Sequence, residues 1–152
     1  MLFRSIGVML DDGTIKNSYC HWDGYVRGVG LKLVENYDSF NKAKDLINLG
    51  DLSYVERMLS TDEPHTFDNP AKGVTVAYMR DRGEKNVESK VLSMDEWMSV
   101  SYSSGIDFYY LYSGGQWWVY DLYAKNGWQN VKSFFPQYSL TAEELEIGRA
   151  HV

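Results

Sequence analysis

The sequence predicts an α+β fold: a single domain over residues 1–152, with a mainly antiparallel sheet built from hairpins and three to five short helices packed on it. Three observations lead to this prediction. Short segments of alternating apolar residues are separated by turn signals such as Asp-Asp-Gly, Gly-Gly and Asn-Gly. Helical segments are grouped between the strands instead of following each one, which favours antiparallel pairing. A chain of 152 residues with 44% hydrophobic residues is long enough for one buried core.

Both halves of the chain contribute strands and helices. In the first half we expect strands over 2–10 and 14–22, a helix over 26–37, a helix that Asp38 or Ser39 caps and that stops at Gly50, and a short helix from a capping box at Ser53. In the second half we expect a polar loop over 60–73, strands over 74–79 and 86–92, a helix over 94–102, a hairpin of 106–113 with 116–123, and a short helix, acidic through Glu143, Glu144 and Glu146, from a capping box at Thr141.

The hairpin around Gly114-Gly115 is aromatic on both faces. With these glycines as a two-residue loop, Tyr112 faces Trp117, and Leu111 faces Trp118 on the other side. One face is expected to pack on the core. The other needs helices, a ligand or a second subunit, because a bare aromatic face would be a sticky patch. A homodimer through this hairpin is therefore one expectation.

Charge and composition restrict the partners. A net charge of −6 argues against DNA or RNA, which need a basic surface. No apolar run approaches the roughly 18 residues of a membrane span, so no membrane partner is expected. The single cysteine, Cys20, favours a cytoplasmic location. No zinc-site, P-loop or dinucleotide motif is complete, so we expect no metal and no cofactor.

Three arginines are candidate ligand contacts. Arg4 shares a strand face with apolar residues, so its shielded guanidinium needs an anion: Asp23, Asp81 or a ligand phosphate. Arg80 and Arg82 end the predicted strand 74–79, and alternation sends both to one face. Such a pair suits phosphate recognition, and it also suits an ordinary surface strand end.

The string Cys-His-Trp-Asp-Gly-Tyr forms a strand-to-helix junction at 20–25, where polar side chains tend to serve binding. Alternation turns Cys20 and Trp22 to the face opposite His21, so both are interpreted as core residues. His21, Asp23 and Tyr25 remain as candidate ligand contacts. A satisfied structural histidine and a helix-capping aspartate are the alternatives.

Three strings, 19–25, 49–53 and 80–84, resemble a family of small bacteriophage and prophage proteins to which no settled activity is attached. The resemblance covers roughly residues 4–84. It departs from the family pattern at Val26, where a proline often stands. It implies a phage setting, in which small acidic proteins often counter host defence and one class sequesters nucleotide immune signals.

We therefore expect an anti-defence protein that sequesters a small anionic nucleotide, of the cyclic ADP-ribose or cyclic dinucleotide kind, without cleaving it. Its expected ligand contacts are Arg4, His21, Asp23, Tyr25, Arg80 and Arg82. One alternative is a phosphodiesterase with His21 and His65 as general acid and base. The other is a protein inhibitor that binds a host enzyme through its acidic surface and aromatic patch.

Overall fold

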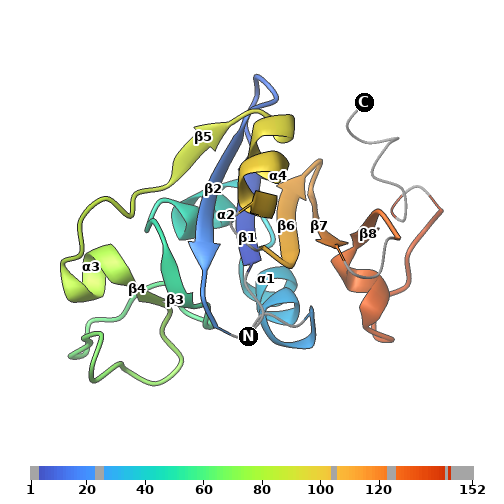
Figure 1. The fold of residues 1–152 in the computed structure, drawn as a ribbon. Helices are drawn as coiled ribbons and strands as arrows, with labels where there is room; N and C mark the ends of the chain where they lie inside the picture. The colour runs from blue at the N-terminus through green and yellow to red at the C-terminus, as the bar shows by residue number, and fades with distance from the viewer. Residues whose placement is uncertain (1–3, 23–25, 104–105, 123–125, 143, 145–152) are drawn as a thin grey trace.

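A mixed sheet forms the centre of the protein, in the order β4-β3-β2-β1-β6-β7-β8 with β5 also paired to β2 (Figure 1). The computed structural model describes residues 4–22, 26–103, 106–122, 126–142 and 144. The strands are β1 (Arg4–Met9), β2 (Ile15–Cys20), β3 (Leu52–Tyr54), β4 (Val76–Ala77), β5 (Lys90–Leu92), β6 (Phe108–Ser113), β7 (Gln116–Asp121) and β8 (Trp128–Asn130). The pairs β1–β6 and β2–β3 are parallel, and the other pairs in the described chain are antiparallel. The prediction of an α+β fold with a mainly antiparallel sheet is confirmed.

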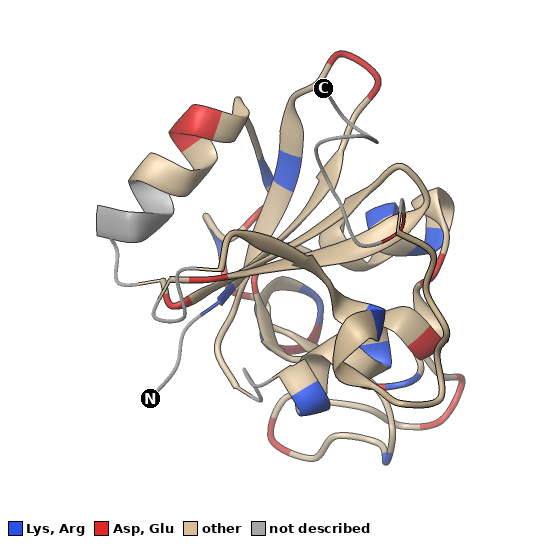
Figure 2. Cartoon of the chain, turned by 90° about the vertical axis from the view of Figure 1, so that its right-hand side faces the viewer, with Lys and Arg blue, Asp and Glu red and all other residues tan. Residues whose placement is uncertain are grey.

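Helices cover both faces of the sheet. They are η1 (Val26–Gly30, a π-helix), α1 (Leu31–Asn36), α2 (Phe40–Ile47), α3 (Tyr78–Arg82), α4 (Met94–Ser103) and η2 (Val131–Phe134, a 3-10 helix). Figure 2 shows the sheet nearly edge-on, with α4 on one side, recognisable by its acidic first turn; α1 and α2 pack on the other side, and α3 lies at the β4 edge (Figure 1). None of the helices described is long and apolar enough to cross a bilayer.

The two faces of the sheet carry two separate cores. The larger core lies under α1 and α2 and includes Ile6 and Leu46, both fully buried. The smaller core lies under α4, where Trp97 is fully buried and its indole N–H donates to the Ser5 hydroxyl at 2.7 Å. Gly7 lies beneath this ring: a Cβ there would lie 3.1 Å from the Trp97 indole. A large ring can therefore lie flat on the sheet.

The aromatic hairpin has the predicted register. Tyr112 lies opposite Trp117, and Leu111 lies opposite Trp118. All residues of β6 are buried within one chain, because one face meets the larger core and the other meets the smaller. These rings are covered without a second subunit, and the homodimer stays a prediction.

Several predicted elements need correction. Residues 53–56 do not begin a helix, because Leu52–Tyr54 forms β3 beside the end of β2. The strand predicted over 74–79 is reduced to β4, and α3 begins at Tyr78. The strand predicted over 86–92 is present in part as β5, which pairs with β2.

The capping predictions are more accurate. Ser39 accepts the Lys42 N–H at the start of α2. Ser93 and Glu96 bond each other's backbone N–H groups at the start of α4. Thr141 and Glu144 form the same reciprocal pair, while most of the predicted acidic helix lies outside the described residues.

Candidate functional site

Helix α3 is fixed at both ends by its own sequence. The carboxylate of Asp81 accepts the Ala77 N–H at 2.8 Å, which satisfies a donor at the helix start. Gly83 ends the helix in the left-handed conformation at φ 69°. Residues two positions apart in a helix are turned by roughly 200°. Arg80 and Arg82 therefore point to different sides, and the predicted same-face pair is wrong.

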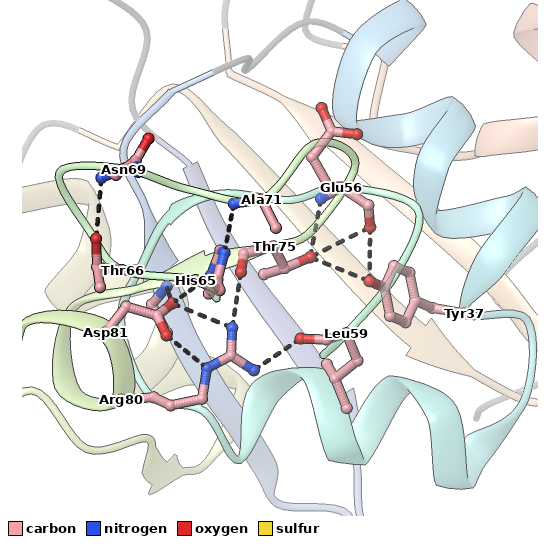
Figure 3. A network of polar contacts seen from close by, with 11 residues as sticks. Tyr37, Glu56, Leu59, His65, Thr66, Asn69, Ala71, Thr75, Arg80 and Asp81 are labelled. Atoms are coloured by element: carbon pink, nitrogen blue, oxygen red, sulfur yellow. Dashed lines mark hydrogen bonds and ion pairs between the residues drawn. The ribbon is translucent and has the colours of Figure 1, made fainter. Parts of the chain in front are cut away.

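Arg80 is held by groups of the protein itself (Figure 3). Its Nε donates to Asp81 at 2.8 Å, and its Nη2 donates to the same carboxylate at 3.1 Å. Nη1 donates to the Leu59 carbonyl and Nη2 to the Thr75 carbonyl, each at 2.7 Å. Four of the five guanidinium N–H donors are thus used to tie the loop before β4 to α3.

His65 completes this network from inside the loop. Its Nδ1 accepts the Ala71 N–H at 2.8 Å, so the neutral ring carries its proton on Nε2. Nε2 lies 3.2 Å from the Asp81 carboxylate, and the two side chains are only 8% and 4% exposed. Because both ring nitrogens are engaged, this arrangement gives no support to His65 as a general acid or base. We call His65, Arg80 and Asp81 the α3 clamp.

Opposing influences set the ionisation of the α3 clamp. Burial alone would raise the pKa of the Asp81 carboxyl, but the hydrogen bonds from Arg80 and from the Ala77 N–H hold it below its ordinary value. The carboxylate thus stays ionised in the folded protein at neutral pH.

Arg82 lies on aromatic rings on the other side of α3. Its guanidinium carbon is 4.2 Å from the ring centre of Phe67 and 4.9 Å from that of Tyr78. These two rings lie 5.3 Å apart. The Arg82 side chain is 48% exposed and forms an ion pair with Glu84 through Nε and Nη2. The guanidinium therefore lies over two rings at cation–π distance and stays about half exposed.

The His21–Trp22 pair joins this surface through Tyr78. The Tyr78 hydroxyl lies 3.0 Å from Nδ1 of His21. The His21 and Trp22 rings are stacked, with centres 4.6 Å apart and planes 13° apart. We define these five residues, His21, Trp22, Phe67, Tyr78 and Arg82, as the aromatic–guanidinium cluster.

Trp22 corrects the prediction that it faces the core opposite His21. Strand β2 ends at Cys20, so alternation does not extend into the junction. The N–H groups of His21 and Trp22 instead donate in succession to the carbonyls of Leu52 and Ser53. Trp22 is left 46% exposed, whereas Cys20 is fully buried, as predicted.

Arg4 is buried inside the protein and is not an exposed member of this cluster. It is 2% exposed, as its place on the apolar face of β1 predicts. Burial raises the pKa of Tyr110, and the charge of Arg4 acts against that rise. Burial also raises the pKa of Tyr19 to about 12, again opposed by Arg4. Asp81, one predicted partner of Arg4, is bound in the α3 clamp.

The structure thus divides the predicted ligand contacts. His21 and Arg82 come together around Tyr78, Arg80 belongs to the α3 clamp, and Asp23 and Tyr25 lie outside the described residues. Among the residues described, no three His, Cys, Asp or Glu side chains are placed to hold a metal ion.

Sequence reasoning missed Phe67 and Tyr78. Phe67 is the one aromatic residue of the polar loop 60–73, which was a signal that the loop packs on something. Tyr78 was missed because it lies in the segment 74–79, which was predicted as a strand, whereas it is the first residue of α3.

The fold and this surface define an α+β protein with partly exposed aromatic and guanidinium groups beside a hydrogen-bonded loop. No protein-family model matches the chain, and no curated protein or solved structure is significantly similar to it. The resemblance to phage proteins stays a prediction, and the function has to be argued from the cluster itself.

Proposed function

We propose that the protein binds a small nucleotide by stacking its base on the aromatic–guanidinium cluster, and holds it without cleaving it. In a phage-infected cell, such a protein would sequester a nucleotide immune signal of the cyclic ADP-ribose or cyclic dinucleotide kind. The observation that carries the proposal is the half-exposed guanidinium of Arg82 over the rings of Phe67 and Tyr78, in one cluster with the half-exposed indole of Trp22.

Planar groups of this kind suit a base. Every base has a π-face, and stacking on an aromatic side chain contributes about 1–3 kcal/mol. Guanidinium planes stack on bases in the same way. Trp22 and Arg82 are both nearly half exposed. Tyr78 contacts Arg82 through its ring and His21 through its hydroxyl, and Trp22 is stacked on His21.

The phosphate contacts differ from those that the sequence predicts. Arg80 has a single N–H donor beyond its internal bonds, so Arg82 is the better candidate. The Nε and Nη2 groups of Arg82 face Glu84, and its Nη1 has no hydrogen-bond partner among the residues described. Nη1 thus offers donors to a phosphate at the edge of the stacked base.

Calorimetry tests the proposal. The protein is titrated with cyclic ADP-ribose isomers and cyclic dinucleotides, with ribose phosphate as a probe that lacks a base. We expect binding of at least one nucleotide and none of ribose phosphate. Trp22→Ala and Arg82→Lys should each weaken binding about tenfold or more, whereas Arg27→Lys, an exposed arginine outside the cluster, should leave it unchanged.

Two results would count against the proposal. The folded protein failing to bind any nucleotide at high micromolar concentration would reject the binding site. Recovery of a hydrolysed nucleotide after denaturation, at a rate that depends on protein, would favour the phosphodiesterase alternative.

A further inference from the structure

A hollow beside α1 and α2 shares no residue with the aromatic–guanidinium cluster. It has a volume of about 170 Å³ and is lined by Asn36, Tyr37, Lys42, Asp45, Arg57 and Leu59. These residues come from three segments: the end of α1, the first two turns of α2, and the chain after β3. The size is below that of clefts for drug-sized ligands and suits a small metabolite.

The floor of the hollow is fixed by hydrogen bonds. Tyr37 is 3% exposed, and its hydroxyl donates to the Glu56 carbonyl at 2.6 Å and lies 3.1 Å from the Thr75 hydroxyl. The phenol hydroxyl is therefore occupied, and the half-buried Leu59 beside Tyr37 offers an apolar surface to a ligand.

The rim carries three charged side chains that have no ion-pair partner among the described residues. Lys42, Asp45 and Arg57 are exposed, and none of them forms an ion pair with another described residue. The nearby Lys32 is different, because it pairs with Glu56 at 2.9 Å. The hollow thus presents two cations and one carboxylate to whatever enters it.

Arg57 has a defined position on this rim. A Cβ built on Gly73 would lie 3.5 Å from Nη2 of Arg57, so the guanidinium lies directly beside that glycine. Gly73 has φ +75°, a conformation that other residues rarely adopt.

We propose that this hollow binds a free α-amino acid with an uncharged side chain. Its carboxylate would meet Arg57 and Lys42, its ammonium group would meet Asp45, and its side chain would lie on Tyr37 and Leu59. A zwitterion offers a partner to charges of both signs. A simple anion offers no partner to the Asp45 carboxylate, and a simple amine offers none to Lys42 and Arg57. The site goes beyond the proposed nucleotide binding and does not depend on it.

Calorimetry with the whole protein tests the site. The probes are the standard α-amino acids, with isocaproate and isoamylamine as analogues of leucine that lack the amine or the carboxylate. We expect at least one uncharged amino acid to bind at millimolar concentration or below, and, for leucine, both analogues to bind about tenfold more weakly.

Variants locate the binding. Arg57→Ala should weaken amino-acid binding about tenfold, and Asp45→Asn should remove the preference over the deaminated analogue. Lys44→Ala is the matched control, because Lys44 lies on α2 outside the hollow and above the Phe40 ring. The inference is overturned if no amino acid binds, if isocaproate binds as tightly as leucine, or if Lys44→Ala weakens binding as much as Arg57→Ala. Trp22→Ala should leave amino-acid binding intact, which separates this site from the nucleotide site.

Discussion

Arg80 and Arg82 belong to the same turn-long helix and have opposite surroundings. Arg80 makes four hydrogen bonds to the protein, two of them to an Asp81 carboxylate that is 4% exposed. Arg82 lies on the rings of Phe67 and Tyr78, with an exposed Glu84 as its ion-pair partner. The first arginine faces backbone carbonyls and the second faces solvent.

The difference between them shows that the burial of the carboxylate partner decides how much an arginine ion pair contributes to stability. When Arg80 is lost, Asp81 remains as a buried and poorly solvated carboxylate, which is costly. When Arg82 is lost, Glu84 is solvated by water at little cost. Arg80 is therefore expected to control stability, and Arg82 is expected to control binding.

Removing the charge of Asp81 is expected to have the largest effect. Asp81→Asn should lower the free energy of unfolding by about 3 kcal/mol, because it breaks a buried pair with two arginine contacts. Glu84→Gln, the matched change at the exposed pair, should cost less than about 1 kcal/mol. Urea unfolding measures both, and equal losses would contradict the contrast between the two arginines.

Truncating His65 is expected to have an intermediate effect. His65→Ala leaves the Ala71 N–H without its acceptor and removes a contact of Asp81, so it should cost about 2 kcal/mol. The amide of Ala71 should then exchange its hydrogen much faster in NMR measurements. Unchanged protection of that amide would show that the α3 clamp does not order the loop.

Acid should weaken the α3 clamp because it protonates the Asp81 carboxylate. Its pKa is lowered in the folded state, so its carboxylate stabilises the protein above the unfolded pKa of about 3.9, and this contribution is lost as the pH falls through the lower folded value. Asp51 acts in the opposite direction, because burial raises its pKa and protonation favours the fold.

The free energy of unfolding, measured from neutral to acidic pH, checks these signs. Asp81→Asn should reduce the loss of stability in acid. Asp51→Asn should make that loss steeper, because it removes the opposing contribution. The reverse pattern would mean that another carboxylate dominates acid unfolding.

The smallest effect on stability is expected at Arg82. Arg82→Lys should change the free energy of unfolding by less than about 0.5 kcal/mol, because the site is exposed. The same variant should lose nucleotide affinity, since an ammonium group has no flat face to stack. A thermal-shift measurement without ligand gives the stability of the variant, and calorimetry with ligand gives its nucleotide affinity. A large loss of stability would mean that Arg82, like Arg80, has a structural role.

Much of the fold could be predicted because its signals are local. Two glycines fix the register of the aromatic hairpin, and Ser93 with Glu96 marks the start of α4. The strand β3 was missed because Ser53 and Glu56 fit a capping box, while a partner distant in the sequence, the end of β2, draws the segment into the sheet.

The candidate site was predicted only in part, for a similar reason. His21 and Arg82 were identified by residue type. Their neighbours Phe67 and Tyr78 come from a loop and a helix whose positions depend on the bonds of Asp81 to His65 and Ala77. Alternation along a presumed strand cannot reveal such bonds, and it placed Arg80 and Arg82 together.

The central position of β1 also determines when the protein can fold during synthesis. β1 and β2 are adjacent in sequence and can pair early, but the other edge of β1 pairs with β6, where Arg4 lies opposite Phe108. Until that distant strand leaves the ribosome, the nascent sheet has an unpaired edge beside Ile6 and Val8, which invites pairing with other chains. Cooperative folding therefore waits until β6 has been synthesised.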